Sequence, residues 1–303
     1  MSRTAAAANG GPRPTGTRPK RRPRWRRIAI IGGGVALAAV TFLYALPKFA
    51  DYGAVWGAIR DLTWLQLLTL AGATAVNILT YAPPLMAGLP GIPFRSALAV
   101  TLASTASTYV APGGAGVGLA VSFGMLRAWG FGASDVGLAV AVTGVWNQFF
   151  LLGAPAVALA LLTLTGDEHA AVQSVALIGL AVFILALAAF AGALWSPRFA
   201  LAVGNGAARL TSWGLRLIRR RPARWSGRSL VGFRARTIGL LRRRWWHLTL
   251  ATVAGQLTVF LVLLVALRAL GVSSGEVSFI EAFGAWSLVR LLGSLPITPG
   301  GIG

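Results

Sequence analysis

The chain has 303 residues, of which 56% are hydrophobic and only 12% are charged. A soluble domain carries about a quarter charged residues, so this composition excludes an ordinary soluble enzyme. The net charge of +21 could indicate a nucleic-acid partner, but the basic residues cluster beside apolar runs. Nine of the 28 Lys and Arg precede residue 28 and thirteen lie between Arg198 and Arg244, a distribution typical of cytoplasmic membrane loops. We therefore expect membrane lipids with anionic headgroups as partners and no nucleic acid.

The scarcity of ligating residues limits the chemistry. The absence of cysteine excludes disulfides and thiolate metal sites, and two histidines are too few for a histidine metal cluster. Seven acidic residues leave few candidates for metal-dependent catalysis. We therefore expect no metal, no cofactor, no catalytic residue and no enzyme activity.

In chain order, residues 1–27 lack helical periodicity and are rich in Ala, Gly, Pro and Arg, which predicts a disordered basic tail. The apolar runs that follow reach about 18 residues and more, enough to cross a bilayer core of about 30 Å. The predicted fold class is all-α, a polytopic helical membrane domain over residues 28–303 with about 7–8 spans. The predicted spans are Ile28–Leu46, Trp64–Ala82, Ser96–Ala111, Asp135–Leu164, Ala171–Trp195, His247–Leu267 and Phe279–Leu295, with a shorter run at Leu119–Arg127.

Proline and glycine positions predict interruptions between or within these spans. Pro47–Asp61 is predicted as an external turn. Pro83-Pro84 is predicted to stop the second span, and Gly153–Pro155 is a candidate break in a longer run, because proline removes a helix donor.

Charge predicts the topology. Residues 197–246 form a basic cytoplasmic segment, which is either a surface-lying amphipathic stretch or a solvated loop. Asp167–His169 and Gly271–Glu276 are predicted as external loops. Keeping both basic blocks inside predicts a multi-pass protein of the cell membrane with a cytoplasmic N-terminus.

Two glycine-rich segments resemble each other. Ala111–Gly118 reads Ala-Pro-Gly-Gly-Ala-Gly-Val-Gly and Thr298–Gly303 reads Thr-Pro-Gly-Gly-Ile-Gly, each after a span that opens near a phenylalanine, Phe94 or Phe279. Broken helices at corresponding places in two halves indicate a transporter binding site. The span count predicts that the two halves form an inverted repeat. The alternative is that both segments are simple tight turns.

Polar residues within spans supply further candidates, because lipid disfavours them unless they face a cavity or a partner. Arg290 could hold a lipid phosphate with its forked guanidinium or pair with a backbone carbonyl. Glu281 lies nine positions earlier, about 14 Å along the same predicted helix and too far to pair with it. Asn147 and Gln148 are expected to join helices or to contact substrate, and Arg127 to lie at the interface or to bind phosphate. The candidate substrate-binding residues are Pro112, Gly113, Gly114, Gly116, Arg127, Asn147, Gln148, Glu281, Arg290, Pro299, Gly300 and Gly301.

A run of hydroxyl residues is a weaker candidate. Ser104, Thr105, Ser107 and Thr108 could line a polar path. Alternatively they bond back to their own helix, as serine and threonine in spans usually do.

The two Pro-Gly-Gly-x-Gly segments, with Gly124–Arg127 and Val145–Phe149, make residues 28–303 resemble an actinobacterial branch of the lysylphosphatidylglycerol synthase transmembrane family. The resemblance implies a flippase-like domain that translocates or handles lipids or lipid-linked substrates, such as aminoacylated phosphatidylglycerol or polyprenyl-linked sugars. Many members carry Gly-Glu after the first Pro-Gly and a Glu-Arg pair in the following helix. Here Gly116-Val117 and Asn147-Gln148 occupy those places, so roles of those carboxylates do not carry over. Relatives usually continue past the second motif, so we expect a chain truncated at its C-terminus.

Two other functions stay open on the sequence alone. The chain could be a non-catalytic membrane scaffold, with its basic segments as docking surfaces. It could also be the membrane part of an aminoacyl or glycosyl transferase system, although no stretch is long and polar enough for an aqueous catalytic domain.

Overall fold

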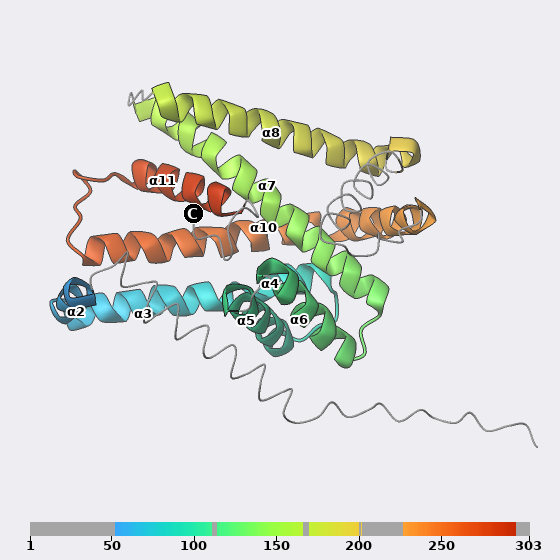
Figure 1. Ribbon diagram of the computed structural model, residues 1–303, viewed down its shortest axis with the longest axis horizontal. Coiled ribbons are helices and arrows are strands. Elements are labelled where there is room, and N and C mark those ends of the chain that lie inside the picture. Colours follow the sequence, from blue (N-terminus) through green and yellow to red (C-terminus); the bar gives the residue numbers. More distant parts are fainter. Residues whose placement is uncertain (1–51, 111–113, 166–169, 200, 202–226, 295–303) are drawn as a thin grey trace, which may run out of the picture. The chain divides into compact units, whose positions relative to one another are not determined.

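The computed structural model describes residues 52–110, 114–165, 170–199, 201 and 227–294 (Figure 1). Every regular element in these residues is a helix, which confirms the all-α prediction. Four helical segments in this part of the chain are long and apolar enough to cross a membrane: Trp64–Gly88, Ala133–Leu162, Leu177–Trp195 and Gly232–Ala269. The predictions that lie outside the described residues are the 1–27 tail, the first span Ile28–Leu46, the loop Asp167–His169 and the second glycine-rich segment.

The first described segment contains three helices, α2 (Tyr52–Arg60), α3 (Trp64–Leu79) and α4 (Ala82–Gly88). The external turn predicted over Pro47–Asp61 is wrong in its described part, because α2 occupies it. Thr63 and Gln66 form a reciprocal capping box that begins α3. Pro83 and Pro84 do not stop a helix. They occupy the first turn of α4, where a backbone N–H has no helical partner to lose.

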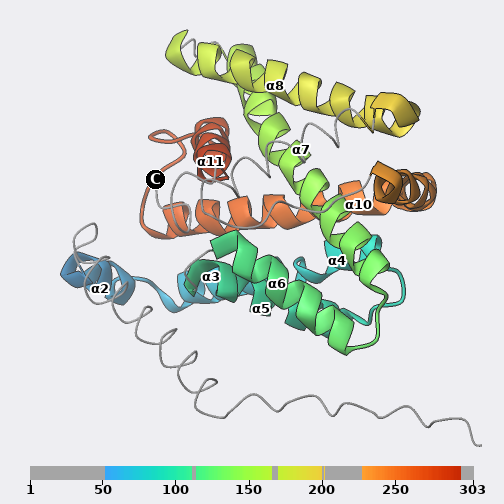
Figure 2. The same cartoon turned by 45° about the vertical axis from the view of Figure 1, so that its right-hand side comes forward.

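Helices α5 (Phe94–Val110) and α6 (Gly114–Ala128) pack against each other as a hairpin (Figure 2). They have 17 and 15 residues. At 1.5 Å per residue they are about 26 and about 23 Å long, shorter than a bilayer core of about 30 Å. From Gly114 onward the first glycine-rich segment is the opening of α6 rather than irregular backbone. Gly114 itself has a φ of 45°, a conformation that glycine adopts without strain.

Helix α7 (Ala133–Thr165) runs for 33 residues and is followed by α8 (Ala170–Trp195). The predicted break at Gly153–Pro155 is wrong, since α7 continues through Pro155. Proline removes only one helical hydrogen bond, and Ala154 and Ala158 on either side of it are buried against α10 and α11. Tertiary packing therefore holds this part of α7 together.

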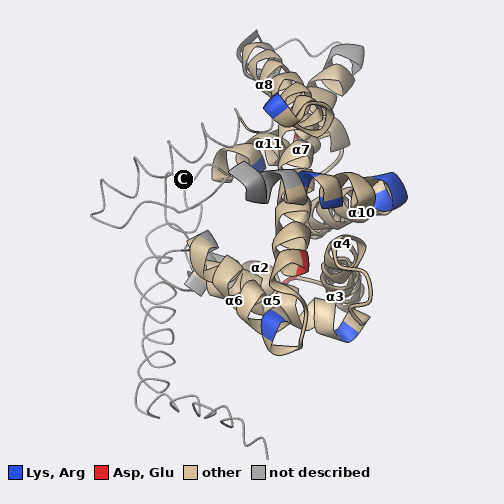
Figure 3. Ribbon diagram, turned by 90° about the vertical axis from the view of Figure 1, so that its right-hand side faces the viewer, with Lys and Arg blue, Asp and Glu red and all other residues tan. Residues whose placement is uncertain are grey.

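Helix α10 (Gly227–Ala269) has 43 residues, about 64 Å, twice the thickness of a bilayer core. The basic segment predicted over 197–246 is thus helical from Gly227 onward and continuous with the predicted span His247–Leu267. Exposed Trp245 and Trp246 mark the change from basic to apolar sequence, as expected at a membrane interface. Figure 3 shows the Lys and Arg positions concentrated at this end of α10.

Arginines also connect helix ends. Arg234 of α10 donates to the carbonyls of Leu194 (2.7 and 3.1 Å) and Trp195 (3.0 Å), which satisfies the C-terminal end of α8. Arg268, in the last turn of α10, donates to three carbonyls of the loop that leads to α11 (Phe279–Gly293). The external loop predicted at Gly271–Glu276 is confirmed as this non-helical connection.

Three buried apolar clusters form the core, and α7 contributes to all of them. The first joins α4, α5, α6 and α7, the second joins α7, α10 and α11, and the third joins α4, α7 and α10. Helices α7 and α10 are consequently flanked by core at both ends of the space between the hairpin and α11.

Candidate functional site

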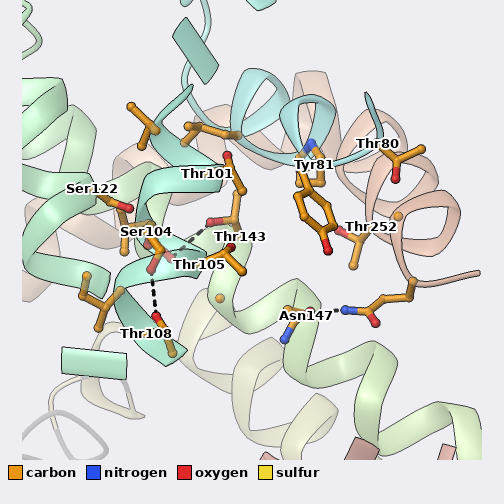
Figure 4. Close-up of a pocket in the computed structure, with 18 of the residues that line it drawn as sticks. Thr80, Tyr81, Thr101, Ser104, Thr105, Thr108, Ser122, Thr143, Asn147 and Thr252 are labelled. Atoms are coloured by element: carbon orange, nitrogen blue, oxygen red, sulfur yellow. Dashed lines mark hydrogen bonds between the residues drawn. The ribbon is translucent and has the colours of Figure 1, made fainter. Parts of the chain in front are cut away.

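A cavity of about 560 Å³ lies between the α3–α4 junction, the α5–α6 hairpin, α7, α10 and α11 (Figure 4). Its wall is polar to an extent unusual for the inside of an apolar helical domain, because membrane helices normally avoid unpaired polar groups. The polar lining residues are Thr80, Tyr81, Thr101, Ser104, Thr105, Thr108, Tyr109, Ser122, Thr143, Asn147, Thr252, Gln256 and Arg290.

Helix α5 supplies a row of hydroxyl groups. Thr101, Ser104, Thr105 and Thr108 are spaced i, i+3, i+4 and i+7, which places them on one face of the helix. Figure 4 shows this row across the cavity from Tyr81, Thr252 and Asn147. The spacing explains how a helix with no overall amphipathic pattern still presents a polar stripe.

Most of these hydroxyls have already used their protons. Thr101, Thr108 and Thr143 each donate to the carbonyl four residues earlier in their own helix, at 2.8, 3.0 and 2.8 Å. Ser104 donates across the hairpin to the carbonyl of Gly118 at 2.9 Å. A hydroxyl that has donated keeps lone pairs and can only accept further bonds. The α5 side of the cavity therefore presents acceptors.

The opposite end carries a cation held by two amides. Arg290 of α11 donates through Nη2 to Oε1 of Gln256 in α10 at 2.8 Å, and Gln256 donates through Nε2 to Oδ1 of Asn147 in α7. A guanidinium can only donate, so the glutamine must turn its oxygen toward Arg290 and its NH2 toward Asn147. Asn147 consequently keeps its own NH2 group as a donor. This end of the cavity presents donors.

Two buried polar atoms at the cavity have no protein partner. They are Nε of Arg290 and Oγ1 of Thr252, whose side chain is only 6% exposed. A buried donor without a partner costs about 1–3 kcal/mol, so such atoms usually have a ligand or water against them. No carboxylate is present among the described residues that line the cavity. The positive charge of Arg290 and its unpaired donor fit an anion.

The structure brings only part of the predicted site together. Asn147 and Arg290 both line the cavity, and Asn147 also makes the interhelical bond expected of it. Arg290 pairs with the side chain of Gln256 instead of a backbone carbonyl. Ser104, Thr105 and Thr108 line the cavity as well. Ser107 does not line it and bonds to its own helix.

The other predicted site residues lie elsewhere. Gln148 is exposed and does not line the cavity. Arg127 is exposed and donates to the carbonyl of Phe131 after the end of α6. Glu281 is exposed and forms the capping box of α11 with Ser278. Gly114 and Gly116 are in the first turn of α6 and are not cavity-lining residues. Pro112, Gly113, Pro299, Gly300 and Gly301 lie outside the described residues.

Sequence reasoning missed Gln256, which occupies the centre of the polar chain. A signal was available, because Gln256 is the one amide in the predicted span His247–Leu267. Thr252, one helical turn earlier, gave no signal, since a single threonine in a span usually bonds back to its own backbone.

A family model described as "Lysylphosphatidylglycerol synthase TM region" matches residues 28–303. The match includes both glycine-rich segments and every described helix. No curated protein and no solved structure matches the chain.

Proposed function

This chain belongs to the lysylphosphatidylglycerol synthase transmembrane family, and from that premise we propose that it translocates or handles a lipid or lipid-linked substrate, which it holds by an anionic headgroup in the central cavity. One observation carries the proposal. The guanidinium of Arg290 reaches the cavity with a buried, unpaired Nε, and no carboxylate from the described residues balances its charge. In this proposal the chain binds and moves its ligand and performs no covalent chemistry.

A phosphate in the cavity would answer the needs of both Arg290 and Asn147. The guanidinium has Nε and Nη1 available, and the Asn147 amide adds a neutral donor held in place through Gln256. Charge-assisted hydrogen bonds contribute about 1.5–3 kcal/mol each, and more where water is excluded. Gln256 therefore acts as a positioning residue between the cation and the amide.

The cavity also has a suitable rim for the apolar part of a lipid. Tyr109 and Leu119 line it and are 66% and 54% exposed, so it reaches the surface between the end of α5 and the start of α6. An aromatic and an aliphatic side chain at this opening would accommodate an acyl chain while the headgroup stays inside. The short helices of the hairpin support the same reading, because broken helices at membrane depth line substrate paths in transporters.

The orientation follows from the basic residues. Translocating the arginines of α10 across a membrane would be costly, so we place the first half of α10 and the N-terminus in the cytoplasm and the protein in the cell membrane. Anionic headgroups at the cytoplasmic face would then lie beside this basic helix end.

The test is lipid translocation by the purified chain in phosphatidylcholine vesicles, with a fluorescent phosphatidylglycerol whose outer-leaflet population is bleached by dithionite. We expect faster loss of fluorescence than in empty vesicles and a reduction of about 10- to 100-fold for Arg290→Gln, the loss of one to two charge-assisted bonds. Arg236→Gln is the matched control, because Arg236 is exposed and bonds only within its own helix.

Two outcomes would overturn the proposal. Translocation no faster than in empty vesicles would exclude translocation of this lipid, and unchanged binding of anionic lipid by Arg290→Gln would exclude the cavity as the headgroup site. If variants of Arg290 also preserved the phenotype of the wild-type chain in cells, a scaffold role would replace the proposal.

A further inference from the structure

The wall of the cavity carries information about the headgroup beyond its negative charge. Building on the proposed function, we infer that the headgroup is a singly charged phosphodiester bearing uncharged hydroxyl groups, and that headgroups bearing an ammonium group are disfavoured.

Charge balance is the first step. Among the described lining residues Arg290 is the one formally charged side chain, and the rest are hydroxyls, amides and apolar groups. One phosphodiester neutralises one guanidinium. An additional ammonium on the same headgroup would leave an uncompensated positive charge in a cavity bordered by buried core, and burying an unpaired charge is costly.

The hydrogen-bond inventory is the second step. Thr101, Ser104, Thr108 and Thr143 have spent their protons on backbone carbonyls and can only accept. A ligand beside them must therefore donate, and it must do so without a charge. Alcohol hydroxyl groups meet both conditions, whereas phosphate oxygens meet neither.

An unpaired buried hydroxyl is the third, independent step. Oγ1 of Thr252 is buried against the cavity and has no protein partner. In Figure 4 it lies near Tyr81, whose phenolic group has no hydrogen bond within the protein either. Hydroxyls that keep their protons can both donate and accept, so they suit further ligand hydroxyls.

The spacing of the two ends fits one small headgroup. Thr143 and Asn147 are one turn apart on α7, and Thr252 and Gln256 are one turn apart on α10. One turn corresponds to about 6 Å along a helix axis. A phosphate beside Asn147 and Arg290 would thus place the hydroxyls of a short polyol on the same headgroup against Thr143 and Thr252.

The experiment compares three lipids that share acyl chains, using the full chain in phosphatidylcholine nanodiscs and displacement of a fluorescent phosphatidylglycerol. Phosphatidylglycerol has the anion and two hydroxyls, phosphatidylethanol has the anion alone, and lysylphosphatidylglycerol adds ammonium groups. We expect phosphatidylglycerol to displace the probe about 5- to 100-fold better than phosphatidylethanol, the value of one to two neutral hydrogen bonds. Lysylphosphatidylglycerol should be at least about 10-fold weaker than phosphatidylglycerol.

Two variants separate the headgroup contacts from the fold. Thr252→Val should lower the affinity for phosphatidylglycerol about 5-fold and leave phosphatidylethanol unchanged. It should also preserve or raise the Tm of the lipid-free protein, because it replaces an unpaired buried hydroxyl with a methyl group of similar shape. Arg290→Gln should weaken both anionic lipids equally.

The outcomes distinguish this inference from the function on which it rests. If neither anionic lipid displaces the probe better than phosphatidylcholine, the proposed headgroup site itself is refuted. If both anionic lipids displace it equally and Thr252→Val has no effect, the site stands and the hydroxyl inference fails. Equal or tighter displacement by lysylphosphatidylglycerol would overturn the exclusion of ammonium headgroups.

Discussion

Replacing Gly118 with alanine should destabilise the α5–α6 hairpin. A Cβ built at Gly118 would lie 2.1 Å from Oγ1 of Thr108, 2.9 Å from the carbonyl oxygen of Ser104 and 3.2 Å from its Oγ. The threonine hydroxyl can rotate away, but the Ser104 oxygen belongs to backbone within α5. Relieving that contact requires the helices to separate by several tenths of an ångström, which also lengthens the Ser104–Gly118 hydrogen bond.

Two opposing effects set the magnitude. Overpacking of a close contact costs about 1–3 kcal/mol. Alanine is a better helix former than glycine by up to about 1 kcal/mol, which favours the substitution. The expected net change is a loss of about 0.5–2 kcal/mol in the free energy of unfolding. Gly124→Ala on the same helix is the matched control, because nothing lies within 4 Å of a Cβ there and only the favourable effect remains.

The assay is thermal unfolding of the purified variants in one detergent, followed by helical circular dichroism. We expect the Tm to fall for Gly118→Ala and to stay level or rise for Gly124→Ala. The double variant Gly118→Ala with Thr108→Ala should recover part of the loss, since the Ser104 carbonyl contact persists. Equal Tm values for the two single variants would refute the claim that the helices touch at Gly118.

Three further predictions concern single contacts. Arg234→Gln should lower the free energy of unfolding by about 1–3 kcal/mol in thermal melts, because the end of α8 loses its charged donor, whereas Arg236→Gln should not; equal melts would contradict this. The backbone N–H and the hydroxyl of Ser273 hold the pKa of Glu276 below its usual range, so the contribution of this contact is present at neutral pH and is lost as pH falls through that lowered pKa. Carboxyl NMR titration should show Glu276 moving partly back toward its ordinary pKa in Ser273→Ala, and no movement would refute the assignment. Asn77→Leu should cost about 1–2 kcal/mol, because the buried Asn77 amide bonds α3 to a threonine of α10; a stability equal to wild type would show that this bond contributes nothing.

Sequence periodicity and length could predict much of the fold. The predicted spans Ala171–Trp195 and Phe279–Leu295 agree with α8 and α11 to within one or two residues, because apolar runs between polar ends are local signals. The errors fell at Pro83 and Pro155. Proline begins a helix as readily as it ends one, and a packed helix tolerates it, so its neighbours in space decide which outcome occurs.

Membrane residence, the all-helical class and the two basic blocks could be determined from the sequence by itself, because they depend on how many apolar residues run together and where charges interrupt them. The cavity needed the tertiary structure. Asn147 and Gln256 are 109 positions apart, and Arg290 follows Gln256 by another 34, so no local pattern indicates that α7, α10 and α11 bring them into one chain of hydrogen bonds. The direction of each bond in that chain follows from a guanidinium that can only donate, a constraint that exists only once the three helices are packed.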